Sequence, residues 1–130
     1  MKRKTLLLVD DDKETRRMLR LFCIHHNYEV VEAVNGQEAL AIIEIDCPDL
    51  VIIDIWMPGI DGFDTVRQIR EKFDCLRLPV LFFTSRSDAR AVKEGLALGA
   101  QGYLSKPTSL VKLLQVIEEL TNDQRPETAV

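Results

Sequence analysis

Short apolar runs alternate with amphipathic stretches along the chain, and this alternation constrains the fold more than any other feature. Five runs have the pattern of strands, at residues 5–9, 29–33, 50–53, 80–83 and 102–105, the fourth of them ending at Thr84. A helical pattern follows each run, at residues 13–26, 36–43, 62–73, 88–98 and 108–120. Strand and helix repeated five times predict right-handed crossovers and a parallel sheet. We therefore expect an α/β fold, a doubly wound five-stranded parallel sheet with five helices, of the flavodoxin-like three-layer type.

The helix starts carry side chains suited to capping. Asn35 and Glu38 have the spacing of a capping box, and Asp61 is a candidate N-cap for the helix that follows it. Thr108 is placed to cap the last helix. The apolar stripe of that helix is expected to be buried, and it consists of Leu110, Leu113, Leu114, Ile117 and Leu120.

Length and composition fit one soluble domain. The chain has 130 residues, of which 46% are hydrophobic and 29% charged. We expect a domain over residues 1–122, followed at residues 123–130 by a polar tail or the start of a linker. A formal net charge of −4 argues against nonspecific nucleic-acid binding, and no segment has the length of a membrane span. Three cysteines without metal-ligand spacing or a disulfide pattern favour a reducing cytoplasm.

Polar residues follow four of the predicted strands. Asp10 and Asp11 come after the first strand, Asp54 after the third, Thr84 ends the fourth, and Lys106 follows the fifth. Functional sites of doubly wound sheets lie at this carboxyl edge. Like charges about 4 Å apart repel by roughly 4 kcal/mol at an effective dielectric of about 20. Either protonation or a hard divalent cation relieves that repulsion, and oxygen ligands of this kind suit Mg²⁺.

Several residues at the strand ends also have a simpler interpretation. Asp12 directly precedes a helix, so we interpret it as an N-cap. Taken alone, Thr84 is an ordinary strand-end residue and Lys106 an ordinary solvated lysine. Their joint occurrence with three aspartates at the strand ends favours a functional site instead.

The chain resembles the receiver domain of bacterial two-component response regulators, of the chemotaxis type. The resemblance covers residues 6–120 and rests on four motifs in order: LLLVDDD at 6–12, VIIDIWMPGIDG at 51–62, LFFTSR at 81–86 and GYLSKP at 102–107. It implies that Asp54 accepts a phosphoryl group from a histidine of a sensor kinase. The resemblance also implies that Mg²⁺ is held by Asp11 as a direct ligand, by Asp10 through water, by Asp54, and by the backbone carbonyl of Trp56.

The resemblance also assigns a switch. Lys106 and the Thr84 hydroxyl would bind phosphoryl oxygens, and Tyr103 would rotate inward from an exposed position as Thr84 moves. A cis Lys106–Pro107 peptide is implied as well. The expected partners are a sensor histidine kinase or phosphotransfer protein, and a downstream effector domain or protein on the face made by the fourth helix, fifth strand and fifth helix. A phosphorylation-dependent homodimer is a further option, whereas direct nucleic-acid or membrane binding by this domain is not expected.

Two alternatives remain at this point. The first is a scaffold that works without phosphorylation, against which the intact acidic residues argue. The second is a haloacid-dehalogenase-like phosphatase, which also uses a strand-end aspartate with Mg²⁺. That class needs a second aspartate two residues later, where this chain has Trp56. We therefore expect a signalling module that catalyses phosphoryl transfer to its own Asp54, rather than an enzyme acting on other substrates.

Overall fold

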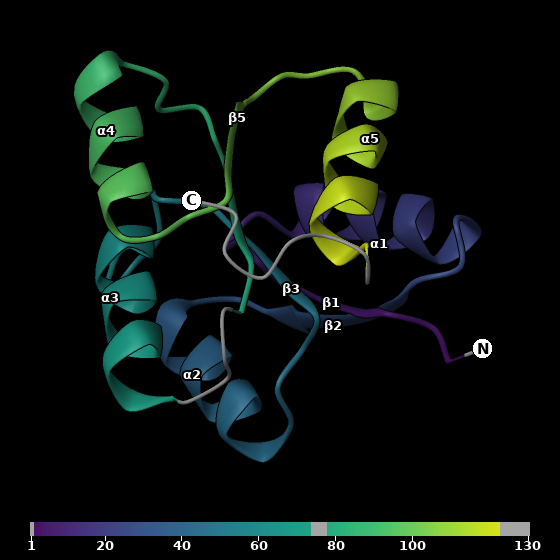
Figure 1. Cartoon of the computed structure of the whole chain (residues 1–130), viewed down its shortest axis with the longest axis horizontal. Helices are drawn as coiled ribbons and strands as arrows, with labels where there is room; N and C mark the ends of the chain where they lie inside the picture. The colour runs from purple at the N-terminus through teal and green to yellow at the C-terminus, as the bar shows by residue number, and fades with distance from the viewer. Residues whose placement is uncertain (1, 74–77, 123–130) are drawn as a thin grey trace.

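One five-stranded parallel sheet organises the molecule, with helices on both faces (Figure 1). The structure is a computed structural model, and it describes residues 2–73 and 78–122. Within these residues the strand order is β2-β1-β3-β4-β5, and every neighbouring pair is parallel. The predicted fold class is confirmed. Cys75 and the expected tail at residues 123–130 lie outside the described residues.

The elements alternate strictly along the chain. The strands are β1 (Thr5–Val9), β2 (Glu29–Ala33), β3 (Leu50–Ile53), β4 (Val80–Thr84) and β5 (Gly102–Ser105). The helices are α1 (Lys13–His25), α2 (Gly36–Ile45), α3 (Gly62–Lys72), α4 (Ala89–Ala97) and α5 (Leu110–Thr121). All five strands lie where the sequence predicts them, and the helix ends differ by up to two residues.

Two apolar cores lie on opposite faces of the sheet. Helices α2, α3 and α4 cover one face and α1 and α5 the other (Figure 1). The three inner strands are buried on both faces, which explains why they are continuously apolar instead of alternating. The sheet is therefore a rigid support for the residues that follow its strands.

Most predicted helix caps are confirmed, and one is wrong. Asn35 accepts a hydrogen bond from the Glu38 N–H at 2.8 Å, and Asp61 accepts one from the Asp64 N–H at 2.8 Å. The cap of α5 is Ser109, not Thr108, because the Ser109 hydroxyl accepts from the Lys112 N–H.

The predicted buried stripe of α5 is only partly confirmed. Leu113, Ile117 and Leu120 are buried, whereas Leu110 is exposed and Leu114 half-buried. Side chains in a helix lean towards its N-terminus, so Leu110 in the first turn leans past the packed face.

Candidate functional site

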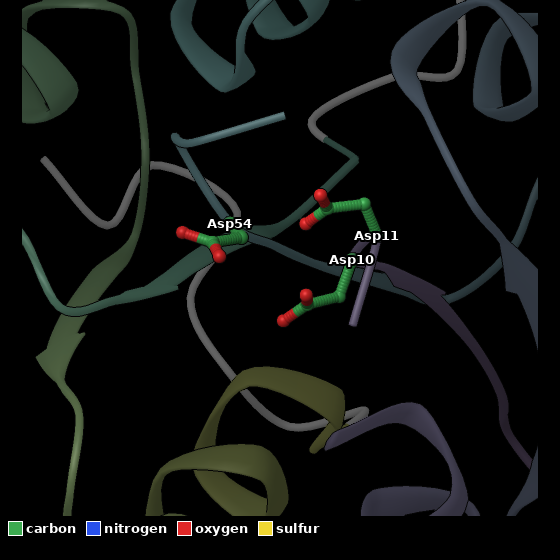
Figure 2. Close-up of side chains that lie close together, drawn as sticks. All are labelled: Asp10, Asp11 and Asp54. Carbon is green, nitrogen blue, oxygen red and sulfur yellow. The ribbon is translucent and has the colours of Figure 1, made fainter. Parts of the chain in front are cut away.

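Three carboxylates meet at the carboxyl edge of the sheet. Asp10 and Asp11 follow β1, and Asp54 follows β3, its hydrogen-bonded neighbour. One oxygen from each lies within 4.8 Å of the other two. Figure 2 shows the three side chains close together. Asp10 and Asp54 are buried, with relative exposures of 4% and 8%, whereas Asp11 is exposed. The structure thus brings together the three aspartates that the strand pattern predicts to converge.

Lys106 supplies a positive charge to this cluster. Its Nζ lies 2.7 Å from Asp10 Oδ2 and 3.2 Å from Asp54 Oδ2. Burial alone would lower the pKa of Lys106, but its hydrogen bonds and attraction to Asp10 and Asp54 outweigh burial, and the pKa is raised. The ammonium is therefore charged near neutral pH. The Lys106–Pro107 peptide is cis, as the family resemblance implies.

Burial shifts the pKa of Asp10 in the opposite direction. It raises the pKa of Asp10, although the hydrogen bond from Lys106 and one from the Asp12 N–H counteract part of the effect. The Asp12 N–H donates to Asp10 Oδ1 at 2.9 Å, and the Trp56 N–H donates to Asp54 Oδ1 at 3.3 Å. The two buried carboxylates are thus oriented by the backbone of the loops that carry them.

Thr84 and Tyr103 both contact the backbone of Arg86. The Thr84 hydroxyl, fully buried, accepts from the Arg86 N–H at 3.3 Å. The Tyr103 hydroxyl donates to the Arg86 carbonyl, and its ring packs 5.8 Å from that of Phe82. Tyr103 is therefore half-buried here, which differs from the exposed starting position expected for it. Desolvation is the main cause of the raised pKa of its hydroxyl group.

An arginine stacked on aromatic rings lies beside the cluster. The Arg86 guanidinium is 5.7 Å from the ring centroid of Trp56 and 5.7 Å from that of Phe63. Trp56 is 57% exposed, so the stack forms part of the surface next to Asp54. The sequence places Trp56 and Arg86 two residues beyond Asp54 and Thr84, but it carries no signal that the two side chains meet.

Comparison with known proteins identifies the family. The sequence pattern of the response regulator receiver domain matches residues 6–118. This chain belongs to the response regulator receiver domain family. Response regulator MprA from Mycobacterium tuberculosis is 39% identical over 124 residues, which are 95% of this chain and 53% of that protein. The chain spans about half the length of such relatives.

Solved structures agree with the family assignment. A putative response regulator from Chloroflexus aurantiacus is 37% identical with a TM-score of 0.87, covering 92% of this chain and 98% of that one. The chemotaxis response regulator CheY4 of Vibrio cholerae is 32% identical with a TM-score of 0.85, over 92% and 99% of the two chains. The chain is thus a receiver domain of two-component signalling, a class of phosphoacceptor switch.

Receiver domains bind a divalent cation in an acidic pocket, and Asp10, Asp11 and Asp54 form an acidic cluster in this structure. Over residues 2–73 and 78–122, the structure contains no helix with the length and apolarity to cross a bilayer.

Proposed function

We propose that Asp54 is the phosphoacceptor of this receiver domain. The observation that supports this proposal is the convergence of Asp10, Asp11 and Asp54 within 4.8 Å, with Lys106 in contact with two of them. Asp54 follows the central strand β3, so its carboxylate is held by a rigid support at the carboxyl edge of the sheet. Such an arrangement is suited to positioning and charge neutralisation, on which phosphoryl transfer depends.

The proposed reaction needs no other nucleophile. An oxygen of Asp54 forms a bond to phosphorus, and the bond from phosphorus to the donor histidine nitrogen breaks, leaving its electron pair on nitrogen. The product on this chain is an acyl phosphate. Lys106, already 3.2 Å from Asp54 Oδ2, binds a phosphoryl oxygen, and the Thr84 hydroxyl binds another.

The acidic pocket fits Mg²⁺. Three carboxylates and one ammonium leave a net negative charge, and carboxylate oxygens are the hard ligands that Mg²⁺ prefers. Asp10, Asp11, Asp54 and the carbonyl of Trp56 would hold the ion. An ion bound there would neutralise negative charge on the phosphoryl oxygens.

Thr84 and Tyr103 form the proposed switch. Support comes from the hydrogen bonds that both residues form with the backbone of Arg86. Thr84 accepts from its N–H, and Tyr103 donates to its carbonyl. A displacement of Thr84 towards a phosphoryl group would therefore be transmitted to Tyr103 and the surface of α4, β5 and α5. We expect an effector on that surface, a cytoplasmic histidine kinase or phosphotransfer protein as donor, and a phosphorylation-dependent homodimer as a further assembly.

Incubation with acetyl phosphate and Mg²⁺, followed by intact mass spectrometry, tests the proposal. We expect one acid-stable, base-labile phosphoryl adduct, absent in Asp54→Asn. Asp12→Asn is the matched control, because asparagine also caps helices and Asp12 caps α1. An adduct on Asp54→Asn, or none on the unmodified chain with either acetyl phosphate or a cognate kinase, would refute the assignment. The second result would favour a scaffold, and sustained turnover of unrelated phosphomonoesters a phosphatase.

A further inference from the structure

Arg16 of α1 contacts the peptide that carries Asp10. Its Nη1 donates to the Asp10 carbonyl at 2.7 Å, and its side chain is only 12% exposed. The Asp10 N–H donates in turn to the carbonyl of Ala33, at the end of β2. Both backbone groups of Asp10 are therefore bound to elements outside its own loop.

The guanidinium of Arg16 is itself held in place. Its Nε lies 3.0 Å from Glu32 Oε1, and the other Glu32 oxygen lies 3.1 Å from Arg20 Nη1. Glu32 belongs to β2 and stands opposite Leu8 of β1, close to the strand end from which Asp10 follows. A planar guanidinium with donors in fixed directions can bind the carboxylate and the carbonyl at the same time, which an ammonium cannot do equally well.

We propose that Arg16 is a positioning residue for the acidic pocket: it holds the loop after β1 so that Asp10 and Asp11 face Asp54. This inference rests on the proposed role of that pocket in binding Mg²⁺. The loop needs such support because three carboxylates within 4.8 Å repel one another, and movement of the loop is the simplest way to separate them. Groups that orient metal ligands in this manner affect metal affinity without touching the ion.

A role through charge and a role through geometry predict opposite changes in Mg²⁺ affinity when Arg16 is replaced. If only its charge mattered, removing a cation near the pocket would strengthen Mg²⁺ binding, because like charges repel. If it positions the loop, removing it weakens Mg²⁺ binding despite that electrostatic gain. Arg16→Lys separates the two effects further, since it keeps the charge and changes only the geometry.

The test is isothermal titration calorimetry with Mg²⁺ on the full chain, with the unfolding free energy of each variant measured in urea. We expect Arg16→Met and Arg16→Lys to raise the Mg²⁺ dissociation constant about 10- to 100-fold. Arg20→Met is the matched control, because Arg20 lies one turn along α1 and also binds Glu32. It should leave the constant within about twofold of that of the unmodified chain.

Three results would overturn the inference. An unchanged dissociation constant in folded Arg16 variants, with a lower unfolding free energy, would make the contact purely structural. Tighter Mg²⁺ binding by Arg16→Met would show that charge dominates. If the unmodified chain bound no Mg²⁺, the metal site itself would be refuted along with the role of Arg16. Arg16→Lys retains the charge and most of the stem, so it serves as the test if Arg16→Met does not fold.

Discussion

Replacing Lys106 with methionine should destabilise the domain in a manner that depends on Mg²⁺. The substitution keeps an unbranched apolar side chain and removes the ammonium. At an effective dielectric of about 20, the contacts of 2.7 and 3.2 Å correspond to attractions of about 6 and about 5 kcal/mol. Two carboxylate oxygens no more than 4.8 Å apart repel by at least about 3.5 kcal/mol on the same scale. Lys106 therefore outweighs the repulsion between Asp10 and Asp54.

The measurable loss is smaller than these attractions, because burying the ions costs desolvation energy. Breaking a buried ion pair by removing one partner costs about 3 kcal/mol, of a total unfolding free energy of about 5–15 kcal/mol for a domain. We expect Lys106→Met to lower the unfolding free energy by about 3 kcal/mol in EDTA. Saturating Mg²⁺ should reduce this loss to less than about 1 kcal/mol, since the ion supplies positive charge to the same carboxylates and stabilises the folded state by mass action.

Acidification should reduce the loss of unfolding free energy caused by Lys106→Met. Burial already raises the pKa of Asp10 above its ordinary value of 3.8, and removing the hydrogen bond from Lys106 raises it further. Between the pKa of Asp10 in the unmodified folded chain and its higher pKa in the variant, the folded variant binds more protons at Asp10 than the folded unmodified chain does. The destabilisation caused by Lys106→Met therefore grows as pH rises through this window and is complete above the higher pKa.

The assay is urea unfolding followed by circular dichroism, in EDTA and in Mg²⁺ at matched ionic strength. Lys93→Met, at an exposed position of α4, is the control and should show no Mg²⁺-dependent difference from the unmodified chain. Equal losses of stability for Lys106→Met in EDTA and in Mg²⁺ would contradict this prediction. That result would assign the effect to packing near Phe83, whose ring centroid lies 5.4 Å from the Lys106 ammonium.

Three further predictions concern the surroundings of the site. Gly62→Ala should cost about 1–3 kcal/mol in urea unfolding, because its Cβ would lie 2.4 Å from the Asp54 carbonyl; an unchanged midpoint would contradict this. Trp56→Ala should speed autodephosphorylation, since the exposed ring would obstruct hydrolytic water; a rate within about twofold of the original would disprove the steric idea. Burial raises the pKa of Cys23 to about 11, so iodoacetamide should modify exposed Cys47 and spare Cys23 in peptide maps of the folded chain, and equal labelling would contradict that burial.

The strands and the residues that follow them were predictable from the sequence alone. Parallel strands present their carboxyl ends at one edge, so Asp10, Asp54 and Lys106 had to share that edge once the alternation of strand and helix was recognised. The helix caps Asn35 and Asp61 were predictable as well, because a cap depends only on residues that are close together in the sequence. The predicted cap of α5 was wrong by one residue. Thr108 and Ser109 both have a side chain that can cap a helix, and only the residue at which the helix begins decides between them.

Contacts between side chains of different elements were decided by the tertiary structure. Lys106 follows β5, which is separated from β3 by β4 in the sheet. It binds both Asp10 and Asp54 only because the loop after β5 reaches these carboxylates. The contact of Arg16 with Asp10, and that of Arg86 with Trp56, have no sequence pattern, since each depends on how a helix or loop packs against its neighbour. Periodicity determines which residues lie on one face of an element, whereas the packing of elements determines which of those residues meet.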